Sequence, residues 1–285
     1  MQALLQDQEF ESVEELNQRI EELNRRGQIS KIADAWKSDD PKWRAQDLAY
    51  EAAETDDLET ALRLIGEALT LDEDCTEAER LIVSLLPMEP ENRIKLMREV
   101  VEKAERNFGD EFFEKQKDHF WEDVSTRPYM RAKRHLAELL MEAGELEEAI
   151  AVFERILELN SMDNQAVRYP LLGLYLASDR RERAGDLISR HPDEEKFSAV
   201  FAWGRVLERW LAGETAEAEA ALERAREGNP YVEDFLTGEQ ELPEEAPDYY
   251  QPGKDSEAQV CALELAIAWK KQPAFREWLR ERGVS

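Results

Sequence analysis

An internal repeat of 34 to 35 residues is the feature that most constrains this sequence. Three alanines, Ala149, Ala184 and Ala218, follow one another at intervals of 35 and then 34 residues. In each copy a residue suited to a turn lies five positions before the alanine, and a large apolar residue lies four positions after it. The turn residues are Gly144, Asp179 and Gly213, and the apolar residues are Phe153, Ile188 and Leu222. Asp56 and Ala61 keep the same five-residue offset earlier in the chain. The period predicts structural units that bury their apolar faces by stacking on one another.

This period and these small positions are typical of the tetratricopeptide repeat, which is a pair of antiparallel helices. We therefore predict an all-α protein, a short right-handed solenoid of tetratricopeptide-type helix pairs over residues 41–230. A weaker pair falls within 77–106, and an aromatic-rich insert at 107–125 interrupts the period. We expect an N-terminal helical lead-in at 1–40. A connector rich in proline and acidic residues, followed by a C-terminal helical cap, is expected at 231–285.

Local signals place helices at both ends of the chain. A Ser at position 12 with a Glu at position 15 forms a capping box, which predicts a helix over 12–26, and a second helix is expected at about 29–37. Two further helices are predicted at about 255–270 and 273–282, because Pro273 suits a first helical position.

The composition narrows the class of partner. Hydrophobic residues make up 42% and charged residues 36% of the chain, which excludes a disordered protein. The formal net charge of −28 would repel phosphate backbones and anionic lipids, so we expect no nucleic-acid partner and no membrane partner. The first residues do not resemble a signal peptide, and Cys75 and Cys261 fit free buried thiols better than a disulfide. These observations predict a soluble, cytoplasmic protein.

No motif predicts catalysis, a metal site or a cofactor. The three histidines, His119, His135 and His191, lack the spacing of paired metal ligands, and no glycine-rich phosphate loop occurs. Pairs of neighbouring carboxylates are common, but in a chain this acidic they indicate solvated helix faces. We therefore expect a protein that is not an enzyme and binds no cofactor.

A group of arginines marks the candidate site. No acidic residue occurs between Asp123 and Glu138, whereas Arg127, Arg131 and Arg134 recur at spacings of four and three that place them on one helix face. The first helices of successive pairs line the concave groove of a solenoid. The residues that we expect to bind a peptide there are Arg127, Tyr129, Arg131, Arg134, Asn164, Gln165, Arg168, Tyr169 and Trp203. Guanidinium groups bind carboxylates in pairs of hydrogen bonds, so the groove would suit an acidic peptide or a chain-terminal carboxylate.

The same stretch carries a family resemblance. The run from Thr126 to Ala132, Thr-Arg-Pro-Tyr-Met-Arg-Ala, is followed by Asp-Asn-Gln at 163–165 and Arg-Tyr at 168–169, and Asn-Pro-Tyr-Val occurs at 229–232. With these motifs the chain resembles the suppressor-of-tumorigenicity-seven family, specifically its bacterial tetratricopeptide relatives. The family usually has a glycine after the Asn-Gln pair, where this chain has Ala166. The resemblance implies a helical-repeat fold and no catalytic residues.

We thus predict a non-catalytic scaffold or adaptor that binds an acidic or carboxylate-bearing segment of a protein in a concave groove. Two alternatives remain at this point: a chaperone-like protein that shields a client by hydrophobic contact, and an enzyme framed by helical repeats. A third interpretation requires no partner, because the arginines could pair with the chain's own 65 acidic residues. The acidic stretch at 239–257 could also occupy the groove itself.

Overall fold

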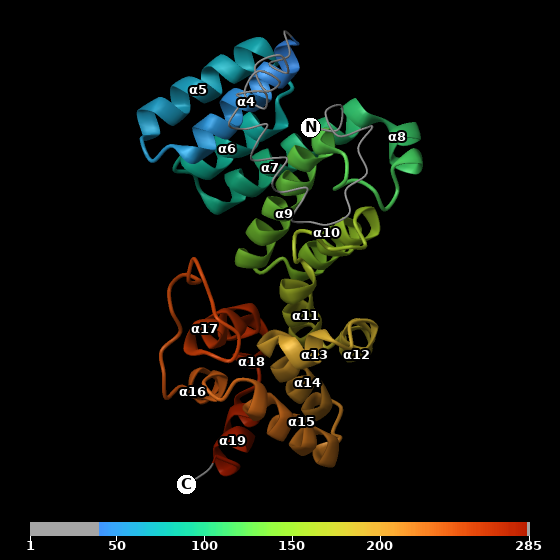
Figure 1. The fold of residues 1–285 in the computed structure, drawn as a ribbon, viewed down its shortest axis with the longest axis vertical. Helices are drawn as coiled ribbons and strands as arrows, with labels where there is room; N and C mark the ends of the chain where they lie inside the picture. Colours follow the sequence, from blue (N-terminus) through green and yellow to red (C-terminus); the bar gives the residue numbers. More distant parts are fainter. Residues whose placement is uncertain (1–39, 284–285) are drawn as a thin grey trace, which may run out of the picture. The chain divides into compact units, whose positions relative to one another are not determined.

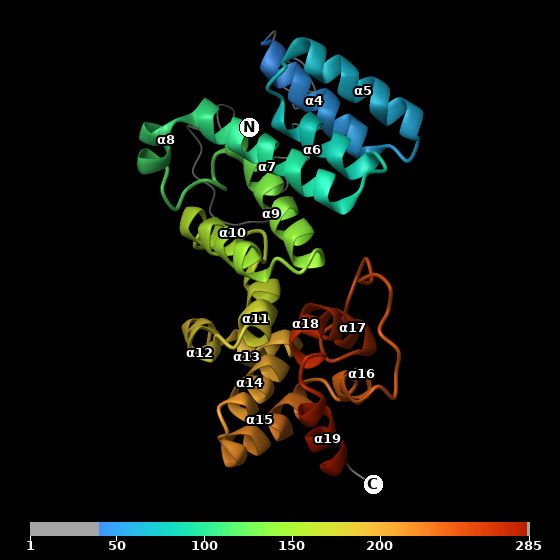
Figure 2. The ribbon, with the colours of Figure 1, turned by 180° about the vertical axis from the view of Figure 1, so that it is seen from behind.

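A computed structural model describes residues 40–283, and within them the chain forms helices joined by turns and loops, with no β-strand (Figures 1 and 2). The predicted all-α class is confirmed. The helices expected at 12–26 and 29–37 lie outside the described residues.

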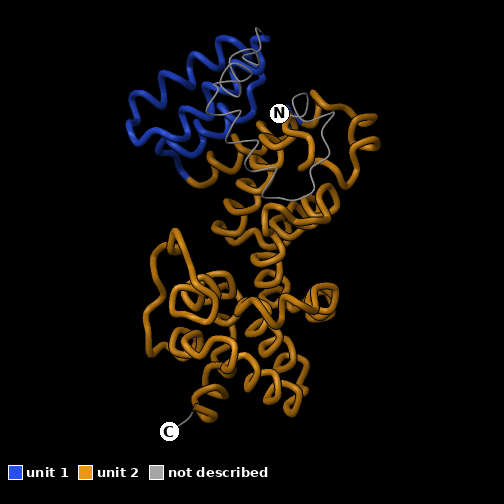
Figure 3. The backbone as a smooth tube through the Cα atoms, in the orientation of Figure 1, with its two compact units in different colours: residues 1–89, 102–104 blue, residues 90–101, 105–285 orange. Residues whose placement is uncertain are grey.

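The chain divides into two compact units (Figure 3). One comprises residues 1–89 and 102–104, and the other comprises residues 90–101 and 105–285. Helix α7 (Pro90–Phe108) contributes residues to both units. The domain limits expected at residues 40 and 230 remain predictions.

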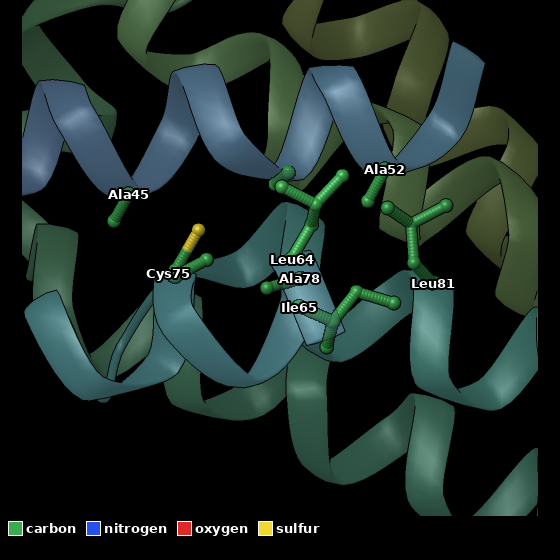
Figure 4. Packing of buried hydrophobic residues seen from close by; sticks show 9 residues of the cluster. Ala45, Ala52, Leu64, Ile65, Cys75, Ala78 and Leu81 are labelled. Atoms are coloured by element: carbon green, nitrogen blue, oxygen red, sulfur yellow. The ribbon is translucent and has the colours of Figure 1, made fainter. Parts of the chain in front are cut away.

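The first unit contains three helices packed through small side chains: α4 (Pro41–Glu54), α5 (Leu58–Leu71) and α6 (Thr76–Leu85). The Asp57 carboxylate caps α5 by accepting a 2.9 Å hydrogen bond from the Thr60 amide. The fully buried residues of α4 are all alanines (Figure 4), so large side chains of α5 and α6 fit against them. The alanines are Ala45, Ala49 and Ala52, and the larger partners include Leu64, Ile65 and Leu81. Cys75 is a free, buried thiol in this core, as predicted.

The second unit contains three helix pairs at the predicted register. They are α9 (Arg127–Glu142) with α10 (Leu146–Leu159), α11 (Arg168–Ala177) with α12 (Arg181–Arg190), and α14 (Ala199–Leu211) with α15 (Thr215–Gly228). The turn residues Gly144, Asp179 and Gly213 have φ angles of 82°, 55° and 77°, which is the left-handed region that favours glycine and tolerates aspartate. The repeat alanines and the apolar residues four positions later are all buried. The register of these three pairs is therefore confirmed.

The aromatic insert packs on the first of these pairs. It contains α8 (Asp110–Lys115) and the 3-10 turn η1 (Val124–Thr126). The ring of Phe120 is fully buried, 4.9 Å from the ring of Phe113 and 5.9 Å from that of Tyr129, between centroids. The Phe120 amide donates to the Leu159 carbonyl at 3.1 Å. The insert thus joins the start of α9 to the end of α10.

The C-terminal helices cover α11 and α14. Helix α17 (Asp255–Glu264) packs on both of them, and α18 (Ala266–Trp269) packs on α11 (Figures 1 and 2). The backbones approach each other closely at Gly173, where an added Cβ would lie 2.4 Å from the Glu264 carbonyl oxygen. Two short helices that the sequence did not predict, α13 (Glu194–Phe197) and α16 (Val232–Thr237), lie before α14 and after α15, and α19 (Pro273–Glu281) packs on α16.

Because α17 begins at Asp255 and α18 ends at Trp269, the segment that packs on α11 and α14 is mainly 255–269 rather than the expected stretch at 239–257.

Candidate functional site

Helix α9 presents a half-exposed charged stripe. Its members are Arg127, Arg131, Arg134 and Glu138, at spacings of four, three and four residues, which place them on one face of the helix. Most of the intervening side chains of α9 are buried. The face that carries this stripe is therefore set by the apolar pattern of the helix. We call these four residues the α9 stripe.

Internal contacts hold two of the arginines in place. The Arg127 guanidinium lies 5.4 Å from the centroid of the Trp121 ring, and its Nε donates to the Trp121 carbonyl at 2.9 Å. Arg134 Nε donates to Glu138 Oε1 at 2.7 Å, and its Nη1 donates to the Gln165 carbonyl at 2.8 Å. The expectation that the chain's own acids neutralise its arginines therefore holds for Arg134, although the acid comes from α9 itself and not from the insert or the tail.

Three of the predicted peptide-binding residues lie in the interior. Tyr129 is 1% exposed and donates through its hydroxyl to Glu105 Oε1 at 2.8 Å, and burial raises its pKa. Trp203 is 1% exposed, and its ring nitrogen donates to the Asn229 carbonyl at 3.3 Å. Gln165 is buried, and its amide donates to the Met130 carbonyl at 3.1 Å. In this structure these side chains join helices and loops and are not available to a partner.

Arg168 and Tyr169 form a second cluster at the start of α11. Arg168 donates to Asp163 Oδ2 at 2.8 Å and to Glu194 Oε1 at 2.7 Å. The Tyr169 hydroxyl donates to Glu194 Oε2 at 2.8 Å, and burial followed by this hydrogen bond raises its pKa to about 12. The Asp163 carboxylate also accepts the Val167 and Arg168 amides and so caps α11. The cluster ties α11 to α13, and of the predicted residues in this loop only Asn164 is exposed.

A carboxyl of the C-terminal helices faces the α9 stripe. Burial raises the pKa of Glu264 to about 7, the positive charge of Arg134 opposes that rise, and the negative charge of Glu138 adds to it. The Glu264 carboxyl at the end of α17 therefore lies within electrostatic range of Arg134 and Glu138. At its other end the stripe contacts the insert, through Arg127 and Trp121.

A cavity that was not predicted lies at the far end of the array. Its volume is about 690 Å³, and it is bounded by α13, the first turn of α14, the last turns of α15, the loop residues Pro252 and Gly253, and Glu257 in the first turn of α17. Four alanines, Ala199, Ala202, Ala221 and Ala225, leave the space that larger side chains would fill. The small residues repeated on α14 and α15 were the only signal in the sequence, and alanine is also the ordinary residue of a tetratricopeptide core.

The described part of the chain offers no metal site of the usual kind, because no three of its His, Cys, Asp or Glu residues lie close enough together to hold an ion. Over residues 40–283, none of the helices combines the length and the apolar character needed to cross a membrane.

Comparison with known proteins supports the repeat. A family model described as tetratricopeptide repeat matches residues 140–202, which run from the end of α9 into α14. Among solved structures the chain is similar to YrrB, described as a TPR protein with an unusual peptide-binding site, at 16% identity and a TM-score of 0.48, over 70% of this chain and 90% of that one. It is also similar to a putative kinesin light chain with nearly identical TPR-like repeats from Podosopora anserina, at 13% identity and a TM-score of 0.45, over 66% of this chain and 96% of that one. No curated protein matches the sequence.

Proposed function

We propose that this protein is a non-catalytic interaction scaffold that binds an acidic or carboxylate-bearing segment of a partner protein on the α9 stripe. The observation that carries the proposal is the position of three guanidinium groups on one half-exposed helix face of a chain with a net charge of −28. Protein binding is the usual task of tetratricopeptide repeats, and their helix pairs commonly provide the binding surface.

The cover on α11 and α14 limits where a partner can bind. Since α17 and α18 occupy those faces, a peptide that follows the first helices of the pairs meets α9 and not the whole array. Arg131 and Arg134 are the central cations of this surface, while Arg168 is held by Asp163 and Glu194 and acts as an anchor of α11. The proposed site is therefore smaller than the nine-residue set expected from the sequence.

The alternative functions require different surfaces. A chaperone-like protein would present a broad apolar groove, whereas the apolar faces of α11 and α14 are covered and the open face of α9 carries charge. An enzyme would require reactive groups converging on a pocket, whereas Arg127 and Arg134 of the α9 stripe are held on a helix face by a cation–π contact and an ion pair. These observations favour the scaffold.

The family resemblance also remains a proposal. It is supported by the contacts between its two main motifs, because Gln165 donates to the Met130 carbonyl and Arg134 donates to the Gln165 carbonyl. A cytoplasmic location and the absence of nucleic-acid partners likewise remain predictions.

A peptide-binding measurement tests the scaffold proposal. Random peptides with free carboxyl termini are selected on the wild-type protein, and the affinity of the best acidic peptide is measured by fluorescence polarisation. Arg131→Ala with Arg134→Ala should weaken binding about tenfold, because two charge-assisted hydrogen bonds are lost.

The control is Arg63→Ala with Arg183→Ala, which removes two charges from side chains that are 58% and 56% exposed and lie outside the stripe. Circular dichroism verifies that both double variants fold. Equal affinities in the two variants, or a selection that yields no acidic peptide, would refute the site.

A further inference from the structure

The cavity beside α13 is distinct from the α9 stripe and has its own chemistry. Its floor consists of alanine methyl groups, and its rim carries the Phe197 ring, whose side chain is 76% exposed. Exposed aromatic rings at the edge of a pocket are a common feature of binding sites, because a partner can bury them. The volume of about 690 Å³ lies within the range of roughly 300–1,000 Å³ that is usual for ligand pockets.

The polar wall of the cavity is already hydrogen-bonded internally. Glu257 Oε1 accepts the Ala199 amide at 3.1 Å, and its Oε2 accepts the Asn229 side-chain amide at 2.9 Å and the Gly253 amide at 2.7 Å. The Glu257 carboxylate therefore caps the start of α14 and takes up the donors that could otherwise bind an anion. An incoming anion would have to compete with a buried carboxylate at this end of the cavity.

The unpaired charge of the lining is negative. Besides Glu257 the lining contains two carboxylates and two cations, and both cations lie near acids: Lys196 Nζ is 3.4 Å from an Asp193 oxygen, and Arg224 Nη2 is 3.7 Å from a Glu195 oxygen. Glu227 is exposed and has no ion-pair partner among residues 40–283. It lies at the C-terminal end of α15, where the helix dipole also attracts positive charge.

We propose that this cavity binds a lysine or arginine side chain from a basic segment of a partner protein. The methylene stem lies against the alanines, in the way that long basic side chains cover apolar surface. The charged group lies near Glu227 and the last carbonyls of α15, and the Phe197 ring that lines the same cavity offers a cation–π contact. The net charge of −28 draws such a segment toward the protein.

A selection from a random dodecapeptide library tests this proposal, with the full chain as the target. The selected peptides should include a group enriched in lysine and arginine, separate from the acidic peptides expected for the α9 stripe, and the best basic peptide is then labelled for fluorescence polarisation. Ala202→Leu places a larger side chain in the cavity from a half-exposed position and should weaken binding about tenfold. Glu227→Gln should weaken it about three- to fivefold, as expected for one exposed ion pair.

Glu223→Gln is the matched control, because it removes the same charge from an exposed position one turn earlier on α15, outside the cavity. Its affinity should stay within about twofold of that of the wild type. Equal weakening by Glu223→Gln and Glu227→Gln would show attraction by net charge alone and would overturn the proposal. Unchanged binding by Ala202→Leu, or a selection without basic peptides, would overturn it as well. Because Glu227 is exposed, its variant remains informative if Ala202→Leu does not fold.

Discussion

The contact between Gly173 and the backbone of α17 offers a direct test of the covered groove. A methyl group at residue 173 would lie 2.4 Å from the Glu264 carbonyl oxygen, whereas ordinary contact begins at 3.4 Å, so α11 and α17 would have to separate by about 1.0 Å at this point. The obstacle is backbone, so no side-chain rotation can relieve it. Overpacking of this kind costs about 1–3 kcal/mol, and the better helix propensity of alanine offsets about 0.5–1 kcal/mol.

We therefore expect Gly173→Ala to lower the free energy of unfolding by about 1–2 kcal/mol and the melting temperature by roughly 2–8 °C. Urea denaturation followed by circular dichroism measures the first quantity. Amide hydrogen exchange should show faster opening of residues 255–269 than in the wild type. A Gly173→Ala variant as stable as the wild type, with unchanged exchange in α17 and α18, would refute the close packing of these helices on α11.

Two glycines serve as controls for this substitution. Gly66 is exposed within α5 and has no atom within 4 Å of an added Cβ, so Gly66→Ala should stabilise its unit by about 0.5–1 kcal/mol. At Gly204 the atom nearest to an added Cβ is Leu172 Cδ2 at 2.7 Å, the end of a side chain that can rotate. Gly204→Ala should therefore lower the free energy of unfolding by less than Gly173→Ala does. Equal effects at Gly173 and Gly204 would show that the backbone contact is not decisive.

Three further outcomes follow from the second unit. Ala166 has a φ of 56°, so Ala166→Gly should raise the free energy of unfolding by about 0.5 kcal/mol in urea denaturation, the left-handed strain exceeding the added freedom of the unfolded chain. The pKa of Glu264 is raised from 4.5 to about 7, so the folded state holds this proton more tightly than the unfolded state, and stability is lost as pH rises between these values. Between pH 5 and pH 8 the free energy of unfolding of the wild type should fall by roughly 1–3 kcal/mol more than that of Glu264→Gln. Parallel plots of the free energy of unfolding against pH for the two proteins would contradict this. Arg168→Ala should lower the free energy of unfolding by about 2 kcal/mol, because Asp163 and Glu194 lose their ion-pair partner. Arg63→Ala, from an exposed pair, should lower it by less than about 0.5 kcal/mol in the same assay.

The helix pairs could be predicted from the sequence because the residues that helix packing restricts recur in every repeat. A buried alanine such as Ala149 and a left-handed turn residue such as Gly144 occupy positions that the neighbouring helix restricts, so both recur at a fixed interval. The short helices α13 and α16 lack such a signal, because four or six residues are too few to show a helical period. The position of α17 and α18 on α11 depends on contacts nearly 100 residues apart in the chain, which no local pattern records.

The candidate site could be predicted only in part, because charge is visible in a sequence and burial of a polar group is not. The spacing of Arg127, Arg131 and Arg134 correctly indicated a common face. The same reasoning could not show that Gln165 and Trp203 lie inside, since their hydrogen bonds go to backbone carbonyls of residues 130 and 229. The cavity beside α13 could not be predicted from the sequence. The alanines that leave its space open are also the ordinary residues of a tetratricopeptide core, so they do not distinguish a cavity from a packed interior.

The C-terminal cover of α11 also affects how the protein folds during synthesis. Helix α11 has seven consecutive buried residues, Pro170 to Leu176, and part of its cover begins only at Asp255. A ribosome that adds about 5–20 residues per second needs on the order of 4–16 s to make the intervening 79 residues, counted from position 176 to position 255. During that interval an apolar helix face is in solution without its final neighbour, where it can bind a chaperone or a second nascent chain. The second unit can complete its core only when nearly the whole chain has been made.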